Sequence, residues 1–194
     1  MMLKTSSKCS QQKLYTEFHK YVTKSLGLES YCKDCKANDS KICFRNQFGQ
    51  AINNAIKDGN YSCLPFTGCD PHFLKLWLEF QFDENMNWGN YGTYFHIDHV
   101  KPFSLFNIED DNDRRLMNHW SNLSPLEKYE NMTKSNKYND EIELNHTTKI
   151  LRLLDYLNKS CPKLYKIAEE SYKNKNTIND ISAGLTQLLR LSKK

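Results

Sequence analysis

The stretch Tyr94-Phe95-His96-Ile97-Asp98-His99-Val100-Lys101-Pro102 decides the fold of this chain. Its alternating pattern predicts a strand over residues 94–100, with Phe95, Ile97 and His99 on one side and His96 and Asp98 on the other. Pro102 is expected to end the strand. Two histidines and a carboxylate held among apolar residues make this segment the candidate catalytic site.

A downstream segment completes the polar set. It reads His119-Trp120-Ser121-Asn122-Leu123-Ser124-Pro125-Leu126, followed by Glu130-Asn131-Met132-Thr133-Lys134. We expect a partner strand over residues 120–123 and a helix that begins with Ser124 as N-cap, Pro125 at its first position and Glu127 closing a capping box. The acidic residues 107–115 between the two strands are predicted to form a solvated loop, because they lack the spacing of a calcium loop.

The downstream helix would bring Asn131 and Lys134 together on one face. Hydrolysis of a phosphodiester needs a base for water, a cation for the leaving oxygen and a positive group for the phosphate. His99 suits the base because its reference pKa lies near neutrality. Asp98 with Asn131 would hold the cation, and Lys134 would contact the phosphate.

These motifs resemble a known family. His96-Ile97-Asp98-His99, Asn122-Leu123-Ser124-Pro125-Leu126 and Glu130-Asn131-Met132-Thr133-Lys134 together look like the HNH endonuclease motif of the ββα-metal superfamily. Residues 77–82 and 88–92 are similar to the same regions of stand-alone HNH proteins of phages and large DNA viruses. The resemblance covers residues 64–137, and it extends more loosely to the N-terminal cysteines.

The resemblance implies a nuclease that cuts or nicks DNA with one magnesium or manganese ion. Asp98 and Asn131 match the metal ligands of the family, and His99 matches the general base. Asn122 matches a structural residue whose amide braces the loop that carries the base. His96 matches a position where acidic or histidine side chains occur, which implies a contact with metal or phosphate.

The first residues predict half of a zinc knuckle. Cys32 and Cys35 form a Cys-x-x-Cys pair, whose thiolates fit a tetrahedral zinc ion, and Cys9 would supply a third ligand. A second Cys-x-x-Cys pair, with Cys9, would need a cysteine at position 6, where this chain has Ser6. We expect His19 to be the fourth ligand, ahead of Cys43. The alternatives are buried thiols without a metal, or a knuckle that has lost its ion; the predicted ligands are Cys9, His19, Cys32 and Cys35.

The segment between the cysteines and the candidate site is predicted to be helical. Apolar residues spaced by three and four predict a helix over residues 42–57. Asp70 as N-cap and Pro71 at the first position begin another helix. Its predicted core residues are Phe73, Trp77 and Phe80. Cys63 and Cys69 are predicted to be small buried hydrophobic residues.

The C-terminal residues 138–194 are predicted to form a helical extension. Pro162 separates its first two helices, and apolar residues from Ile178 to Leu189 predict a third. An apolar stripe of this kind packs in a core or forms a contact between two copies, so a homodimer through these helices stays open.

Charge and composition restrict the class of protein. The net charge is +4, and residues 96–137 carry 6 Lys or Arg against 7 Asp or Glu, whereas both flanks are basic. This pattern suits DNA gripped on both sides of a metal site. Seven cysteines indicate free thiols or metal ligands, and the absence of a long apolar run or signal peptide predicts an intracellular protein of the host cytoplasm or nucleus, without membrane contact.

The predicted architecture is α+β, with a ββα-metal unit, helical support and a helical extension. Its expected parts are a zinc knuckle at residues 1–40, helical support at 41–92, the catalytic unit at 93–137 and the C-terminal extension at 138–194. The predicted function is a DNA endonuclease. A zinc-stabilised module that binds DNA without cutting it is the alternative, and a zinc-stabilised protein-interaction domain is a third class.

Overall fold

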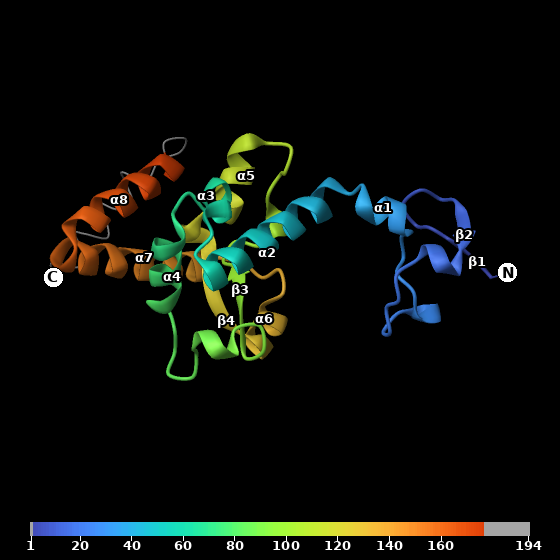
Figure 1. Ribbon diagram of the computed structural model, residues 1–194, viewed down its shortest axis with the longest axis horizontal. Coiled ribbons are helices and arrows are strands. Elements are labelled where there is room, and N and C mark those ends of the chain that lie inside the picture. The colour runs from blue at the N-terminus through green and yellow to red at the C-terminus, as the bar shows by residue number, and fades with distance from the viewer. Residues whose placement is uncertain (1, 177–194) are drawn as a thin grey trace. The chain divides into compact units, whose positions relative to one another are not determined.

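The computed structural model describes residues 2–176 and divides the chain into two compact units, Met1–Gln50 and Ala51–Lys194. The fold is mixed: helices predominate, and the strands form two small antiparallel sheets (Figure 1). The α+β class is therefore confirmed. No helix within residues 2–176 is long and apolar enough to cross a membrane.

The first unit is built around a very small core. Strand β1 (Leu3–Thr5) pairs with β2 (Gln12–Leu14), and the short helix α1 (Lys33–Ala37) follows. Phe18, Leu28 and Cys32 form its buried cluster. A cluster of this size stabilises a fold weakly, so a cross-link or a bound metal is expected to contribute.

Helix α2 (Ser40–Asp58) follows and matches the helix predicted over residues 42–57. The Asp39 carboxylate accepts a hydrogen bond from the backbone N–H of Ile42 at 3.1 Å and forms an ion pair with Lys8. The helix ends at Gly59, whose φ of +63° lies in the left-handed region that glycine adopts without strain.

The helices that support the candidate site begin as predicted. In α4 (Pro71–Glu79), the Asp70 side chain accepts a hydrogen bond from the Phe73 N–H at 2.9 Å. Phe73 and Trp77 are buried, but the prediction for Phe80 is wrong: it is 39% exposed because the helix ends before it. Cys63 and Cys69 are buried beside the short helix α3 (Leu64–Thr67), as predicted.

The second sheet pairs β3 (Phe95–His99) with β4 (Leu123–Glu127). Asp98 lies opposite Ser124, and His99 lies opposite Leu123. The partner strand thus begins later than predicted, because Trp120–Asn122 form a 3-10 turn.

The predicted helix start at Ser124 is wrong. Residues 124–127 extend as a strand, and α6 (Lys128–Lys134) begins after Glu127, whose carboxylate accepts hydrogen bonds from the N–H groups of Tyr129 (2.8 Å) and Glu130 (3.1 Å). Pairing with β3 stabilises the extended conformation, and a two-stranded sheet has only edge strands, where a proline such as Pro125 is tolerated.

The acidic segment before β4 contains a helix that the sequence did not predict. Helix α5 (Asp111–Asn118) begins after Asp110, whose side chain accepts hydrogen bonds from the N–H groups of Asn112 and Asp113, each at 2.9 Å. Its last turn buries Met117 and Asn118. The acidic first turn is favourable because it lies at the positive end of the helix dipole.

Two packed helices complete the second unit. Helix α7 (Asp140–Ser160) buries Ile150, Leu153 and Leu157, and α8 (Pro162–Asn176) begins at the predicted break (Figure 1). The predicted third helix lies outside the described residues, and the dimer contact stays a prediction. The remaining 3-10 turns are Tyr15–Glu17, Ser25–Gly27, Tyr61–Cys63, Trp88–Asn90 and Phe103–Leu105.

An aromatic core fixes the small sheet to the helices. Trp77 and Trp120 are fully buried and meet edge to face, with ring centroids 5.2 Å apart. The Trp77 indole N–H also donates to the backbone carbonyl of Leu123 at 2.9 Å. Helix α4 thereby holds β4, and with it the strand pair that carries the candidate site.

Candidate functional site

An ion pair joins strand β3 to helix α6 at the candidate site. The Lys134 ammonium lies 2.5 Å from Asp98 Oδ2 and 2.6 Å from the backbone oxygen of His99. The side chains are 16% and 26% exposed for Lys134 and Asp98, so solvent screens the pair only in part. The site thus holds a positive charge against two oxygen atoms at the end of β3.

The His99 ring contacts a residue that the sequence did not identify. His99 Nε2 lies 2.9 Å from Asn118 Oδ1, at the end of α5. Asn118 is fully buried. No sequence signal pointed to Asn118, because its burial depends on a helix that the polar residues 107–115 were not predicted to form.

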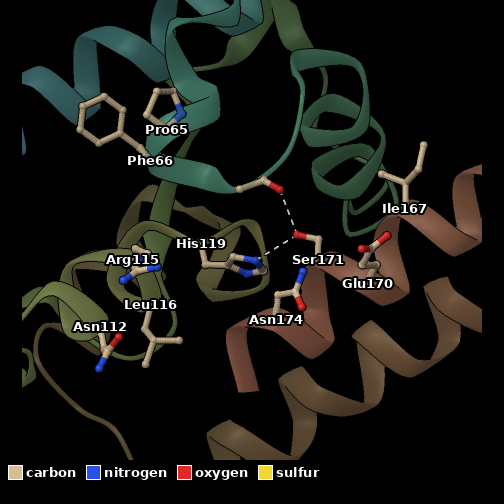
Figure 2. A pocket seen from close by; sticks show the side chains of 11 residues that line it. Pro65, Phe66, Asn112, Arg115, Leu116, His119, Ile167, Glu170, Ser171 and Asn174 are labelled. Carbon is tan, nitrogen blue, oxygen red and sulfur yellow. Dashed lines mark hydrogen bonds between the residues drawn. The ribbon is translucent and has the colours of Figure 1, made fainter. Parts of the chain in front are cut away.

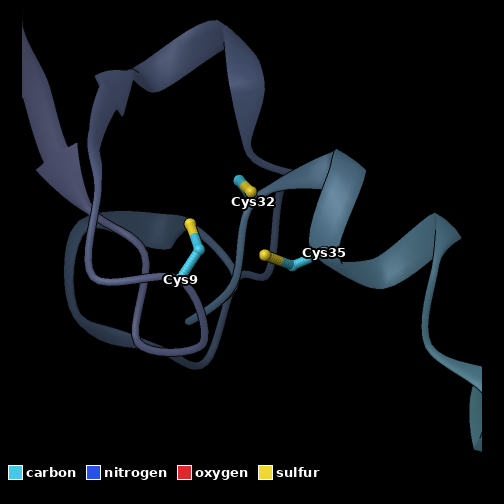
Figure 3. A group of neighbouring side chains, drawn as sticks. All are labelled: Cys9, Cys32 and Cys35. Atoms are coloured by element: carbon cyan, nitrogen blue, oxygen red, sulfur yellow. The ribbon is translucent and has the colours of Figure 1, made fainter.

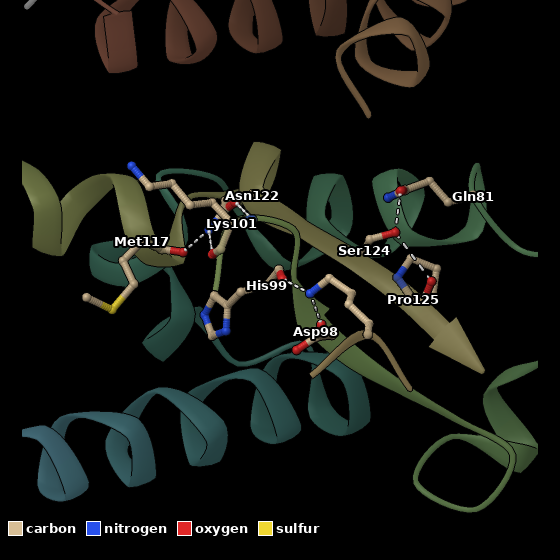
Figure 4. A network of polar contacts seen from close by, with 9 residues as sticks. Gln81, Asp98, His99, Lys101, Met117, Asn122, Ser124 and Pro125 are labelled. Carbon is tan, nitrogen blue, oxygen red and sulfur yellow. Dashed lines mark hydrogen bonds and ion pairs between the residues drawn. The ribbon is translucent and has the colours of Figure 1, made fainter. Parts of the chain in front are cut away.

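The Asn122 amide fastens the loop that follows His99. Its Oδ1 accepts a hydrogen bond from the Lys101 N–H at 2.9 Å, and its Nδ2 donates to the carbonyls of Lys101 (3.2 Å) and Met117 (2.7 Å) (Figure 4). The Val100 N–H donates to the Asn122 carbonyl at 2.8 Å. One buried residue therefore holds two segments far apart in sequence, and it contacts no reacting group itself.

A cavity of about 200 Å³ opens beside the ion pair. Asp98, His99 and Lys134 line it together, and Asp98 is the one carboxylate of the lining. The other lining residues are Val100, Ser124, Leu126, Ile142, Asn145, His146 and Lys149. Helix α7 therefore forms a wall of the site, which its apolar stripe alone did not reveal.

The α7 wall adds a second amino group to the cavity. Partial burial lowers the pKa of Lys149, and the negative charge of Glu130 opposes that shift. The His146 ring binds the Ser121 carbonyl at 2.8 Å and so links α7 to the turn before β4. Both lysines of the lining, Lys134 and Lys149, carry groups suited to an anionic ligand.

Two of the three residues predicted to bind the catalytic metal lie outside the cavity lining. His96 is on β3, and its Nε2 contacts the Gly92 carbonyl at 3.2 Å. Asn131 lies on α6, three residues before Lys134. The structure thus brings Asp98, His99 and Lys134 together, gives Asn122 a bracing position, and leaves His96 with a local backbone contact.

A larger cavity of about 450 Å³ lies elsewhere in the second unit (Figure 2). His119 Nε2 lies 3.2 Å from Ser171 Oγ, which donates to the Gly68 carbonyl at 2.9 Å and accepts from the Trp120 indole at 3.1 Å. These bonds tie α8 to the loop after α3. Gly68 has a φ of +67°, and a Cβ added there would lie 3.0 Å from the His119 ring, so a larger residue would be strained at this position.

Three cysteines of the first unit form a candidate metal centre. The sulfur atoms of Cys9, Cys32 and Cys35 all lie within 4.8 Å of one another (Figure 3). Within residues 2–176, no other group of three histidine, cysteine or acidic side chains converges in this way. Soft thiolates at such spacing are suited to zinc.

The structure does not bring the predicted fourth zinc ligand to the three thiols. His19 does not belong to the converging group, and the Cys43 thiol instead contacts the Ala37 carbonyl at 3.0 Å. Fully buried Ser6 lies beside the cluster: its hydroxyl is 3.9 Å from the Cys35 sulfur and accepts from the Cys32 N–H at 3.2 Å. The β1–β2 turn brings Ser6 to the sulfur atoms, whereas His19 follows on a separate loop.

Hydrogen bonds alter the acidity of the three thiols. The backbone N–H of Cys35 is the main cause that lowers the pKa of Cys32 to about 6. The Ser6 hydroxyl lowers the pKa of Cys9, whereas the bond to Cys32 raises the pKa of Cys35. A thiol that ionises near neutral pH is ready to bind a metal cation, because the thiolate is the ligand.

Comparison with known proteins finds relatives in Acanthamoeba polyphaga mimivirus. The chain is 34% identical to the uncharacterized protein L426 over 129 residues, which cover 65% of this chain and 56% of L426. It is 35% identical to the uncharacterized protein L246 over 111 residues, which cover 57% of this chain and 47% of L246. No known family profile and no solved structure matches the chain. It is therefore similar to mimivirus proteins that are themselves uncharacterized, and it spans about half the length of the curated relatives it matches.

Proposed function

We propose that this chain is a metal-dependent endonuclease that hydrolyses phosphodiester bonds in DNA through a ββα-metal unit made of β3, β4 and α6. The observation that carries the proposal is the meeting of Asp98, His99 and Lys134 in one cavity at the end of β3. The Asn122 amide, which fixes the loop after His99, adds support. This set combines a base, a hard anionic ligand and a cation in one place.

In the proposed reaction, His99 accepts a proton from the attacking water. An imidazole is suited to this step because it changes charge near neutral pH. Lys134 contributes positive charge beside the phosphate. The phosphate oxygens would then compete with Asp98 for Lys134. This competition is possible because Asp98 and Lys134 both line the cavity that the phosphate would enter.

Asp98 and Asn131 are the proposed ligands of one magnesium or manganese ion. Carboxylate and amide oxygens are the hard donors that these ions prefer. The Lys134 ammonium lies against Asp98 Oδ2 and the His99 carbonyl, so the local oxygens already stabilise a cation. When bound, the divalent ion would stabilise negative charge on the leaving oxygen. We leave His96 out of the ligand set because its ring contacts the Gly92 carbonyl.

DNA is the proposed substrate because the cavity offers two amino groups from different helices, Lys134 on α6 and Lys149 on α7. Contacts of this kind with phosphates do not read sequence, so the proposal does not specify a recognition site. Binding should weaken with salt, because each neutralised phosphate releases counterions.

Cleavage of supercoiled plasmid with magnesium or manganese tests the proposal. We expect His99→Ala to reduce the cleavage rate about 100-fold or more, since general bases contribute on the order of 10²–10⁴. The matched control is His72→Ala, which removes an exposed histidine at the start of α4 and should leave the rate unchanged. Undiminished activity of His99→Ala would show that His99 is not the general base. A wild-type protein that cuts neither single- nor double-stranded DNA would refute the proposed endonuclease function.

The alternative is a zinc-stabilised module that binds DNA without cutting it, which the converging thiols of the first unit favour. Salt-dependent DNA binding without cleavage would assign this function. Absence of DNA affinity at low salt would favour a protein-interaction domain.

A further inference from the structure

Asn118 is a buried polar residue to which the proposed reaction assigns no role. It is fully buried at the last position of α5, and its Oδ1 lies 2.9 Å from His99 Nε2. Its Nδ2 is buried and has no hydrogen-bond partner within residues 2–176. An unpaired buried amide group destabilises a fold, and a leucine of similar volume would avoid that cost. Packing therefore does not account for an asparagine at this position, and its contact with His99 does.

We propose that Asn118 is a positioning residue that fixes both the orientation of the His99 ring and the nitrogen that carries its proton. This inference rests on the proposed nuclease function. A neutral imidazole donates through one nitrogen and accepts through the other. An amide oxygen that faces Nε2 requires the proton to be on Nε2, which makes Nδ1 the nitrogen that accepts a proton from water.

The opposite amide orientation would not serve the reaction. Nδ2 of Asn118 could donate to an unprotonated Nε2, but once His99 has taken a proton both of its ring nitrogens are donors. The amide nitrogen would then face another donor. With Oδ1 toward Nε2, one hydrogen bond serves both the neutral and the protonated ring, so neither side chain must rotate during turnover.

The same short segment also holds the loop after His99. Met117, next to Asn118, accepts a hydrogen bond from Asn122 Nδ2 at 2.7 Å, and Asn122 binds Lys101. Residues 117–122 therefore fix the His99 ring through Asn118 and the backbone beyond it through Asn122. Both contacts limit the freedom of the proposed base, which is the condition for an aligned proton transfer.

Asn118→Leu tests the proposal, and Asn112→Leu on the same helix is the matched control. We expect Asn118→Leu to keep or raise the thermal midpoint, to lower kcat about tenfold or more, and to change KM by less than about twofold. Nitrogen chemical shifts of the His99 ring, measured where the imidazole is neutral, should show the proton on Nε2 in the wild type and a mixture of tautomers in Asn118→Leu. Asn112→Leu should match the wild type in kcat and in these shifts.

A conservative variant separates positioning from folding. Asn118→Asp keeps an oxygen acceptor for the N–H at Nε2, so the His99 proton should stay on Nε2. Asn118→Ala removes the acceptor, so the preference for the Nε2 proton should be lost. These two variants replace Asn118→Leu if Asn118→Leu does not fold. A wild-type ring protonated on Nδ1, or identical His99 shifts in the wild type and Asn118→Leu, would overturn the inference. An Nε2-protonated ring in a wild-type protein that cuts no DNA would uphold the placement of Asn118 and refute the nuclease.

Discussion

Ser6 determines how completely the first unit can surround a metal. Three sulfur atoms converge, and the hydroxyl of the buried Ser6 lies 3.9 Å from one of them, the Cys35 sulfur. A neutral hydroxyl is a poor zinc ligand, so the ion would be held by three strong donors. The wild-type affinity for zinc should therefore be lower than that of a four-cysteine site.

We predict that Ser6→Cys binds zinc at least about tenfold more tightly than the wild type, because a fourth thiolate replaces a neutral hydroxyl. Competition with a chromophoric chelator measures the difference. Ser7→Cys is the control, since Ser7 is exposed and its hydroxyl binds the Ser30 carbonyl. Equal affinities of Ser6→Cys and the wild type would show that Ser6 does not face the metal.

The role of a residue could be predicted from the sequence where a motif defined it. It could not be predicted where tertiary contacts set the role. The Cys-x-x-Cys spacing identified Cys32 and Cys35, and Cys9 joined them. His19, the predicted further ligand, does not lie in this group, because a sequence alone does not show which loop turns toward the sulfur atoms. Asn118 escaped detection because its burial depends on α5, a helix that an acidic, polar composition did not predict.

At the scale of elements, the start of α6 shows how a local signal can mislead. Ser-Pro-x-Glu is typical of a helix N-terminus, yet residues 124–127 pair with β3 and the helix begins four residues after Ser124. Local capping preferences contribute about 1 kcal/mol, which a strand pairing and its packing exceed. By contrast, Asp70 and Pro71 begin α4 as predicted, because no neighbouring strand competes for them.

We predict that Glu127→Ala lowers the free energy of unfolding by about 1 kcal/mol, because the backbone N–H groups of Tyr129 and Glu130 lose their acceptor. Urea denaturation measures the change. Glu130→Ala, in the first turn of the same helix, should have a smaller effect because its side chain does not cap the helix. Similar losses for both variants would exclude Glu127 as the cap.

The contacts of Asp39 at the start of α2 should make the stability of the folded protein depend on pH. The hydrogen bond from Lys8, with the Ile42 N–H, lowers the pKa of Asp39. A carboxyl whose pKa is depressed on folding stabilises the protein above its unfolded pKa of about 3.9 and loses that contribution as the pH falls through its lower folded value.

We therefore predict that Asp39→Asn lowers the thermal midpoint at neutral pH and that its difference from the wild type disappears in acid, below the ordinary carboxyl range. Thermal unfolding followed by circular dichroism across that range measures this. Asp58→Asn, at the other end of α2, should instead be neutral or slightly stabilising, because a negative charge is unfavourable at a helix C-terminus. A constant difference for Asp39→Asn at every pH would contradict the predicted linkage.

At the scale of the whole molecule, the two units differ in what stabilises them. The first has a buried cluster of Phe18, Leu28 and Cys32 beside its thiols. The second contains the tryptophan core and the candidate site. The sequence predicted the thiols of the first unit and the burial of Trp77 in the second. It did not predict that α7 lines the cavity, since an apolar stripe does not indicate which surface it covers.

We predict that a strong zinc chelator increases amide hydrogen exchange in residues 3–36 and leaves β3, β4 and α4 protected, because the converging thiols found within residues 2–176 lie in the first unit. Exchange followed by mass spectrometry, with and without added zinc, measures this. Cys35→Ser should reproduce the effect of the chelator. Exchange in residues 3–36 that is insensitive to both treatments would show that the thiols hold no structural metal.

The ion pair between Lys134 and Asp98 would hold the proposed nuclease in an inactive state. Because Lys134 supplies a counter-charge, the Asp98 carboxylate is already paired before any divalent ion arrives. Activation of the proposed nuclease then requires a divalent ion to replace Lys134 at Asp98. The released lysine becomes available to a phosphate oxygen of the substrate. In the proposed nuclease, the concentration of free magnesium or manganese would therefore set how much of the protein has Lys134 released from Asp98.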